Sequence, residues 1–354
     1  MPSPDPTPPA TPPSVTPYAE LDPQTVLHAL QCAGLDADGR LLQLNSYENR
    51  VYQAHLDDGR VVVAKFYRPG RWSDAQIAEE HSFSAELAEA DLPVVAPFDL
   101  TPPAGNGFVH LADGVPTLAH YRCDSGAVFR FAVCNRRAGR APELENPETI
   151  AWLGRLIGRL HAVGGRSAFA HRRTINTATY GHAPRQRLID AGFVHADTES
   201  AWLAASAQAL AAVDAAFERA QPLRLIRLHG DCHPGNVLWR DEGEQRGPHF
   251  VDLDDACMGP AIQDLWMLLP GERGAVDGAL YQLLDAYRDF APFDERELSL
   301  IEPLRTLRMI HHSAWLAERW SDPAFPVAFP WFASPAYWQQ QTTELREQLE
   351  RMQD

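Results

Sequence analysis

Residues 227–241 read RLHGDCHPGNVLWRD, and residues 250–256 read FVDLDDA. The first stretch is a loop punctuated by proline and glycine, with apolar segments on both sides. Asn236 follows Asp231 by five residues, and Asp252 follows Asn236 by sixteen, at the end of a second short apolar segment. A carboxylate, an amide and a second carboxylate in this order and spacing are typical of a phosphoryl-transfer loop and its metal-binding aspartate.

The donor atoms in this pattern suit a hard cation. Magnesium prefers oxygen ligands and usually keeps several waters, so one carboxylate and one amide oxygen are a sufficient protein contribution. Asn236 and Asp252 supply that pair, which leaves Asp231 to accept or orient the proton of an attacking hydroxyl. Cys232 and His233 do not indicate zinc, because consecutive residues seldom converge on one ion and no second cluster at zinc spacing follows.

A single lysine stands upstream of this loop. Of 31 basic residues, 30 are arginine and one, Lys65, is lysine. It lies in the second of two apolar runs joined by Asp57-Asp58-Gly59, which predicts a β-hairpin with Lys65 near the end of its second strand. A chain that uses arginine almost everywhere retains a lysine where the site needs a compact ammonium group, which the planar guanidinium of arginine cannot replace.

The hairpin belongs to a larger pattern of strands and helices. Helices are expected at 21–33 and 74–90. Further short apolar stretches complete a small antiparallel sheet at 94–98, 107–111, 115–121 and 127–133. After a polar connector, apolar residues recur at helical spacing over 148–163, and 197–220 is alanine-rich. We predict an α+β fold of two lobes, β-rich in front and helical behind, with a cleft between them.

The start of the chain differs from the rest. Residues 1–17 hold eight of the 29 prolines and almost nothing apolar, so burial cannot offset their ordering entropy. We expect a disordered proline-rich tail, an N-terminal lobe over 18–134 and a mostly helical C-terminal lobe over 135–354.

Composition excludes several classes of partner. With 31 basic and 47 acidic residues, the net charge is −16, and such a surface repels nucleic acid and anionic membrane. There is no apolar run of about 18 residues and no signal-peptide pattern. The five cysteines are sparse and contain no C-x-x-C pair, which predicts reduced thiols. We expect a cytoplasmic monomer.

Longer tracts of the chain resemble the bacterial stress response kinase A family of serine/threonine kinases. This family lies within the branch of the protein-kinase-like superfamily that includes aminoglycoside phosphotransferases and choline kinases. The tracts are LNSYENRVYQ (44–53), RLHGDCHPGNVLWRD (227–241), FVDLDDA (250–256), GPAIQDLWMLL (259–269) and DPAFPVAFPWF (322–332). The resemblance implies a protein-kinase-like fold with a nucleotide-binding front lobe, a catalytic back lobe, and ATP and Mg²⁺ as cofactors.

The resemblance also implies roles in the front lobe. Lys65 would hold the α- and β-phosphates of ATP, and Glu80 on the following helix would pair with it. Glu79 and Glu86 compete with Glu80 for that position. Ser46 would belong to the loop that covers the phosphates.

In the back lobe, the resemblance makes Asp231 the catalytic base and Asn236 and Asp252 the magnesium ligands. Asp264 would brace the loops from below rather than touch substrate. One departure concerns the phosphate-covering loop, which is glycine-rich in eukaryotic protein kinases because backbone amides approach the phosphates closely. Here residues 44–49 contain no glycine.

The resemblance favours an ATP- and Mg²⁺-dependent serine/threonine protein kinase with a role in bacterial stress response. One alternative is a small-molecule kinase acting on an aminoglycoside, choline or a homoserine-like hydroxyl, because the chemistry at the γ-phosphate is the same. A second alternative is a non-catalytic nucleotide-binding regulator. Such regulators usually lack the lysine, the base or the metal aspartate, and all three are present here.

Overall fold

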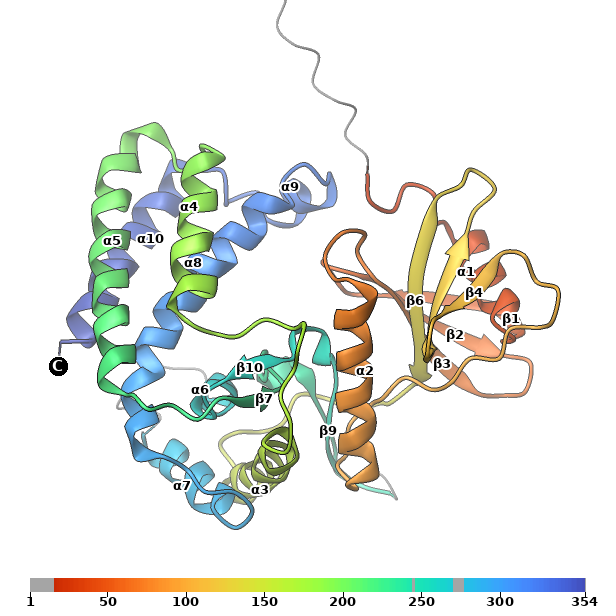
Figure 1. Ribbon diagram of the computed structural model, residues 1–354, viewed down its shortest axis with the longest axis horizontal. Helices are drawn as coiled ribbons and strands as arrows, with labels where there is room; N and C mark the ends of the chain where they lie inside the picture. The colour runs from red at the N-terminus through yellow and green to blue at the C-terminus, as the bar shows by residue number, and fades with distance from the viewer. Residues whose placement is uncertain (1–15, 244–245, 270–276, 354) are drawn as a thin grey trace, which may run out of the picture.

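The computed structural model describes residues 16–243, 246–269 and 277–353 of the 354-residue chain. Two lobes make up the molecule (Figure 1). The N-terminal lobe is a six-stranded sheet with two helices, and the C-terminal lobe is mostly helical with two small two-stranded sheets. The predicted two-lobed α+β fold is therefore confirmed.

The N-terminal sheet has the strand order β1-β2-β3-β6-β5-β4, and every neighbouring pair is antiparallel. Strands β2 and β3 form the predicted hairpin. Along β3, Ala64 and Phe66 are buried while Lys65 points to the opposite face, because side chains alternate along a strand. The strands are β1 (Ala37–Leu44), β2 (Arg50–Leu56), β3 (Val61–Phe66), β4 (Val109–Ala112), β5 (Val115–Arg122) and β6 (Val128–Asn135).

One helix packs on each face of this sheet. Helix α1 (Pro23–Cys32) shares a hydrophobic core with the buried residues of β2, β3 and β6. Helix α2 (Asp74–Glu89) packs on the face to which Lys65 belongs, through Ile77. Ser73 and Gln76 form a capping box at its start, which satisfies amides that have no partner within the helix. Both helices were predicted, and α2 is placed to bring an acidic residue to Lys65.

The prediction of a strand at 94–98 is wrong. This segment forms only isolated bridges, because Pro93 and Pro97 break the series of backbone amide donors that a strand needs. Val94 instead bridges Phe250 of the C-terminal lobe. The segment therefore ties the two lobes together, in place of adding an edge to the sheet.

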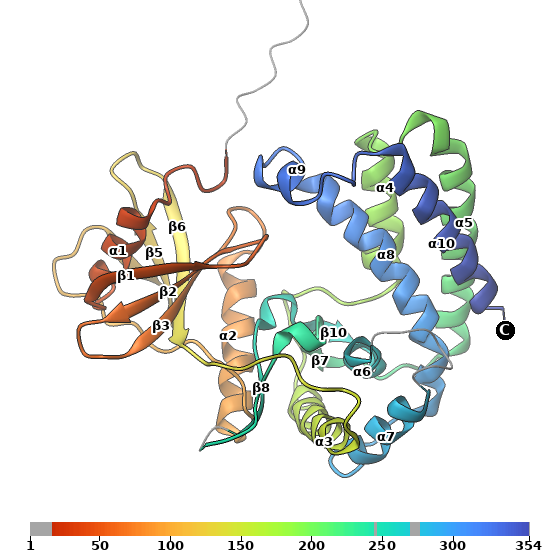
Figure 2. The same cartoon turned by 180° about the vertical axis from the view of Figure 1, so that it is seen from behind.

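In the C-terminal lobe, α3 packs against α7, and α5 packs against α10 and α8. Figure 2 shows α8 running diagonally through this lobe, with α9 at its end on the side of the N-terminal sheet. The helices are α3 (Pro147–Gly164), α4 (Ala183–Asp190), α5 (Ala196–Arg219), α6 (Ile262–Leu268), α7 (Asp277–Tyr287), α8 (Ile301–Glu318), α9 (Ala324–Ala328) and α10 (Pro335–Arg351). The strands are β7 (Ile226–Leu228), β8 (Val237–Arg240), β9 (Gly247–Phe250) and β10 (Cys257–Gly259), which pair as β7–β10 and β8–β9.

A linker over 136–146 joins β6 to α3, so the division proposed between residues 134 and 135 falls at the end of β6. The division into separate folding units stays a prediction. Most of the predicted tail, residues 1–15, lies outside the described residues. Among the described helices, none is both long enough and apolar enough to cross a membrane.

Candidate active site

Lys65 lies on β3 among three carboxylates. Its Nζ is 3.4 Å from Asp254 Oδ1 and 3.9 Å from both Glu80 Oε2 and Asp252 Oδ1. The lysine side chain is 19% exposed, and those of Glu80 and Asp254 are each 4% exposed. Burial opposes the charged ammonium, but Glu80, Tyr67 and the two aspartates together raise the pKa of Lys65 well above its usual range. Lys65 is therefore a fixed positive charge at the junction of the lobes.

The structure shows which of the three candidate glutamates on α2 pairs with Lys65. Only Glu80 lies at the lysine. Glu79, one residue earlier on α2, points elsewhere and accepts hydrogen bonds from the backbone amides of residues 170–172. Glu86 pairs with Arg227 at 2.6 Å. All three glutamates are engaged, and each ties α2 to a different part of the molecule.

The loop that carries Asp231 is held from below by Asp264. This buried carboxylate accepts hydrogen bonds from the backbone amides of His229 at 2.8 Å and Gly230 at 2.9 Å. Its third partner is His161 Nε2 at 3.1 Å. Burial raises the pKa of Asp264, but its hydrogen bonds and the nearby imidazoles outweigh burial and lower it. The expected bracing role of Asp264 agrees with these contacts.

Gly230 has a backbone reason to be glycine. Its φ of +86° lies in the left-handed region, and a Cβ here would collide with the Asp255 carbonyl. The close approach brings the Asp231 loop against the turn over 252–255.

Asp231, Asn236 and the strand before Asp252 are joined by hydrogen bonds. Asn236 Nδ2 donates to the Asp231 carbonyl at 2.9 Å, and it lies 3.5 Å from Asp231 Oδ2. The Val251 amide donates to the Asn236 carbonyl at 3.0 Å, and His229 Nε2 donates to the Val251 carbonyl at 2.9 Å. These contacts place Asp231, Asn236 and Asp252 in one connected unit.

Asp252 has a left-handed backbone, with φ 60° and ψ 60°. A non-glycine residue in this region is strained by about 1 kcal/mol, and such residues cluster at functional sites. Its carboxylate keeps 55% of its side-chain surface exposed. The surrounding protein and the neighbouring Asp254 and Asp255 raise the pKa of Asp252 above its usual range, against the opposing charge of Lys65. The turn thus presents an open carboxylate beside the lysine.

A family model described as the phosphotransferase enzyme family matches residues 40–301, which include every residue placed above. The chain belongs to this family. The match begins within β1 and ends at the start of α8. It covers most of the N-terminal sheet, the C-terminal lobe as far as α7, and the junction where Lys65 meets the acidic turn.

Two relatives match this phosphotransferase along nearly its whole length. Stress response kinase A of Escherichia coli (strain K12) is 42% identical over 337 residues, which are 95% of each chain. Serine/threonine protein kinase RdoA of Salmonella typhimurium is 43% identical over 331 residues, which are 94% of this chain and 93% of the relative. The predicted membership of the stress response kinase A family is confirmed, and the chain is an enzyme that transfers phosphoryl groups.

Solved structures share the fold at low sequence identity. The amicoumacin kinase hAmiN, in complex with AMP-PNP, Ca²⁺ and Ami, has a TM-score of 0.66 at 19% identity and covers 94% of both chains. A microcompartment-associated aminopropanol kinase also has a TM-score of 0.66, at 18% identity, over 94% of this chain and 98% of its own. At these identities the likeness shows a phosphotransferase fold.

Asp254 is a residue of the site whose place did not follow from the sequence. This residue is nearer to Lys65 than Asp252 is, and Arg71 Nη1 donates to its Oδ2 at 2.5 Å. Burial raises the pKa of Asp254, but Lys65, Arg71 and Arg172 outweigh burial and hold it below its usual range. The three aspartates in FVDLDDA indicate that more than one carboxylate could lie near the lysine. Only the folded turn shows which of them is nearest to it.

The phosphotransferase holds its glycine-free loop over 44–49 with side chains. Glu48 accepts from Trp315 Nε1 at 2.5 Å and from Arg319 Nε at 2.7 Å, both on the C-terminal lobe. Ser46 Oγ accepts only the Asn49 amide, at 3.3 Å, among the described residues. No non-glycine residue of this loop has a positive φ, so its backbone does not require glycine. The loop is placed by an anchor on the opposite lobe.

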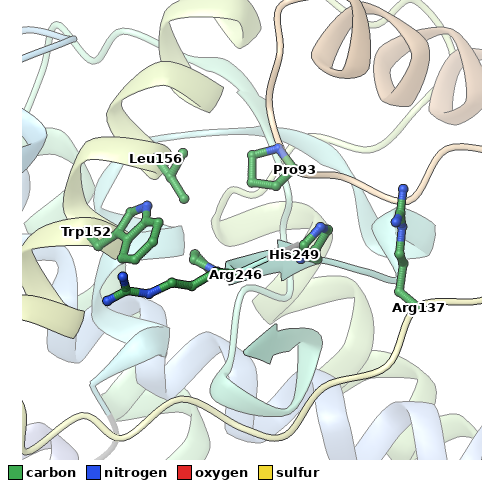
Figure 3. Close-up of a pocket in the computed structure, with 7 residues that line it drawn as sticks. Pro93, Arg137, Trp152, Leu156, Arg246 and His249 are labelled. Atoms are coloured by element: carbon green, nitrogen blue, oxygen red, sulfur yellow. The ribbon is translucent and has the colours of Figure 1, made fainter. Parts of the chain in front are cut away.

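A separate pocket of about 470 Å³ lies beside the linker (Figure 3). It is lined by residues of α3, β9 and the segments around them: Pro93, Arg137, Trp152, Leu156, Arg246, Pro248 and His249. None of the residues gathered around Lys65 or Asp231 lines it. The chemistry predicted from the sequence therefore belongs to the lobe junction and not to this pocket.

Proposed function

We propose that this phosphotransferase moves the γ-phosphoryl group of ATP to a serine or threonine hydroxyl of a protein. One observation supports this proposal above all. Lys65, with its acidic partners, lies next to the connected unit of Asp231, Asn236 and Asp252. The relative named as a serine/threonine protein kinase supports the acceptor class. The relatives' names also support a role in bacterial stress response.

In this proposal the front lobe binds the donor. Lys65 contacts the α- and β-phosphates of ATP, since its ammonium is fixed in place and opposes phosphate charge. Glu80 holds Lys65 in position. Ser46 and the loop over 44–49 cover the phosphates, with Glu48 as the anchor of the loop. The AMP-PNP named for the solved amicoumacin kinase supports a nucleotide donor.

Asn236 and Asp252 fit a magnesium ion. The amide nitrogen of Asn236 is used by Asp231, and within the described ranges its Oδ1 accepts no hydrogen bond. The Asp252 carboxylate is more than half exposed. Both are hard oxygen donors. Magnesium bound by them would neutralise phosphate charge, and the Ca²⁺ named for the amicoumacin kinase supports a divalent cation.

The transfer step is a single displacement at the γ-phosphorus. The acceptor hydroxyl gives its proton to an Asp231 carboxylate oxygen, and its oxygen forms a bond to the γ-phosphorus. The bond between that phosphorus and the β–γ bridging oxygen breaks, and ADP leaves with the bonding electron pair. Asp231 contributes mainly alignment, while Lys65 opposes the charge that spreads over the phosphates.

The proposal is tested by incubating the full chain with γ-labelled ATP and Mg²⁺. Lysate proteins or generic protein acceptors form one arm, and a panel of aminoglycosides, choline and amino alcohols forms the other. The expected result is label on serine and threonine that is absent with the Asp231→Asn variant. Label on a metabolite alone would replace the protein acceptor by the small-molecule alternative. ATP binding with no transfer in either arm would support the non-catalytic regulator.

A further inference from the structure

The carboxylate proposed as the catalytic base is paired with an arginine from α8. Arg308 Nη1 donates to Asp231 Oδ1 at 2.8 Å. The arginine side chain is 46% exposed and that of the aspartate is 25% exposed. An exposed ion pair of this kind contributes little to stability. A charged ligand can therefore replace either partner with little loss of folding stability.

The two oxygens of Asp231 have different surroundings. Oδ2 faces the loop itself, with Asn236 Nδ2 at 3.5 Å and His233 Nε2 at 3.6 Å. Oδ1 faces Arg308. The oxygen that an acceptor hydroxyl can approach from outside the loop is thus covered by the guanidinium. Arg308 has to move off this oxygen, or share it, when the acceptor binds.

Arg308 has hydrogen-bonding capacity left for a ligand. A guanidinium carries five N–H groups. In the parts of the chain that the structure describes, its Nη1 contacts Asp231 and the Met267 sulfur, and its Nε and Nη2 donate to no protein acceptor. Asp231 is also its only carboxylate partner within those ranges. The free edge of the guanidinium fits a carboxylate or phosphate.

Three arginines, Arg308 among them, lie near His311 on α8, in a chain whose net charge is −16. Burial, with Arg173, Arg187 and Arg308 nearby, lowers the pKa of His311 to about 3, and Asp255 is the carboxylate that opposes them. Arg187 is neutralised by Glu318 at 2.5 Å. Arg173 lies over the Trp72 ring and, within the described ranges, has no ion pair.

The next turn of α8 adds no charge at neutral pH. Burial and Arg308 lower the pKa of His312 to about 4, although Asp231 acts in the opposite direction. The fixed charge beside Asp231 Oδ1 is therefore the single guanidinium of Arg308. A cationic acceptor would meet like charge here, and an anionic acceptor would meet opposite charge.

We propose that the acceptor carries an anionic group close to its hydroxyl, and that Arg308 binds this group. Resting on the function proposed above, this makes the substrate an acidic segment of a protein, with aspartate or glutamate beside the serine or threonine. Arg308 exchanges Asp231 for the acidic group of the acceptor. That exchange frees Oδ1 to take the hydroxyl proton at the moment the acceptor is in place.

The test uses three peptides that share one serine and differ only in its flanking residues: aspartate, alanine or lysine. Transfer from γ-labelled ATP is measured as kcat/KM. The wild type is expected to prefer the aspartate peptide over the alanine peptide by about tenfold, the effect of one charge-assisted hydrogen bond, and to use the lysine peptide least. The Arg308→Gln variant is expected to lose this preference, so that the aspartate-to-alanine ratio falls to about one.

Two further variants separate recognition from a structural effect. Arg155 forms a matched exposed pair with Asp289 at 2.9 Å, on α3, and Arg155→Gln should keep the full preference. Arg308→Lys keeps the charge and should restore part of the preference. Equal use of the three peptides by the wild type, or a preference that survives Arg308→Gln, would overturn the proposal.

The same assay distinguishes this inference from the proposed protein acceptor. If no peptide is labelled, small alcohols that carry a carboxylate or phosphate are compared with neutral and cationic alcohols. Preference for the anionic alcohols that Arg308→Gln removes would keep the role of Arg308 and refute the protein acceptor. Preference for cationic alcohols would refute the role of Arg308 and leave phosphotransfer itself intact.

Discussion

The surroundings of Lys65 and of Asp231 are built in opposite ways. The glutamate and aspartate nearest to Lys65 are each 4% exposed, and Arg71 and Asn49 hold the aspartate, Asp254, from its other side. Asp231 is 25% exposed and pairs with one half-exposed arginine. The region that we assign to ATP is therefore assembled before any ligand arrives. The region that we assign to the acceptor is held by a contact that a substrate can exchange.

This contrast predicts different responses to substitution. Removing one partner of a buried ion pair leaves an uncompensated charge and destabilises a protein by about 3–5 kcal/mol. Removing one partner of an exposed pair changes stability by about 0–1 kcal/mol. Substitutions around Lys65 should lower both activity and stability, whereas substitutions at the Asp231–Arg308 pair should change activity alone.

Among substitutions around the nucleotide region and the elements that support it, the largest effect is expected for Lys65→Met. The substitution removes the charge that opposes the phosphates, so phosphotransfer should fall by about 10²–10³-fold, with weaker ATP binding. Glu80 and Asp254 lose their cation, so the melting temperature should fall as well. Labelled-phosphate transfer, calorimetric titration and thermal melting measure the three quantities. Wild-type transfer by this variant would remove Lys65 from the mechanism.

Glu80→Gln is expected to come next. Without its carboxylate, Lys65 loses a partner at 3.9 Å, and transfer should fall by about tenfold to a hundredfold. Glu86→Gln is the matched control on the same helix, since its carboxylate pairs with Arg227 and its side chain is 37% exposed. Initial rates at saturating and limiting ATP give kcat and KM for both variants. Equal loss in the two variants would mean that the effect comes from α2 and not from the lysine.

The third effect concerns the anchor of the loop over 44–49. Glu48→Gln weakens the contacts with Trp315 and Arg319, so the KM for ATP should rise by about fivefold while kcat changes little. Glu143→Gln, in an exposed pair with Arg140 at 2.8 Å, should leave the KM unchanged. A loss confined to kcat would contradict a role of Glu48 in covering the phosphates.

The last effect leaves the chemistry untouched and is a pH dependence of stability beneath the Asp231 loop. Glu297 accepts the Ile262 amide at the start of α6, the helix that carries Asp264. Burial raises the pKa of Glu297 from 4.5 to about 7, so the folded state binds a proton that the unfolded state releases between these pH values. Its contribution to stability is complete below pH 4.5 and is lost as the pH rises through about 7.

Glu297→Gln should therefore gain stability relative to the wild type as the pH rises from 4.5 to 8. The upper limit is about 3.5 kcal/mol, because the pKa rises from 4.5 to about 7 and each pKa unit is worth about 1.4 kcal/mol. Denaturant unfolding at several pH values measures the difference. A difference that stays constant over this range would show that Glu297 does not titrate in it.

Much of this fold can be predicted from local sequence patterns. The hairpin around Lys65, the helix with Glu80 and the loop with Asp231 each follow from turn residues and apolar periodicity within a few tens of residues. Such reasoning failed at 94–98, because the prediction of a strand there rested on apolar content alone. Pro93 and Pro97 lack the backbone N–H groups that a β-ladder needs.

The contacts that the sequence did not reveal join distant parts of the chain. Arg308 reaches Asp231 across 77 residues, and Trp315 reaches Glu48 across 267. No periodicity or spacing encodes such pairs, since they depend on how α8 crosses the back lobe. The same holds for the choice among the three glutamates on α2, which differ in direction around the helix and not in chemistry.

We expect Lys65 and its partners to bind the nucleotide, whereas Asp231 acts on the acceptor. The most direct test measures ATP affinity and label transfer together for Asp231→Asn. We expect ATP affinity within about threefold of the wild type and transfer reduced by about 10²–10⁴-fold. Undiminished transfer by this variant, or a loss of ATP binding as large as its loss of transfer, would show that the two residues do not divide these roles.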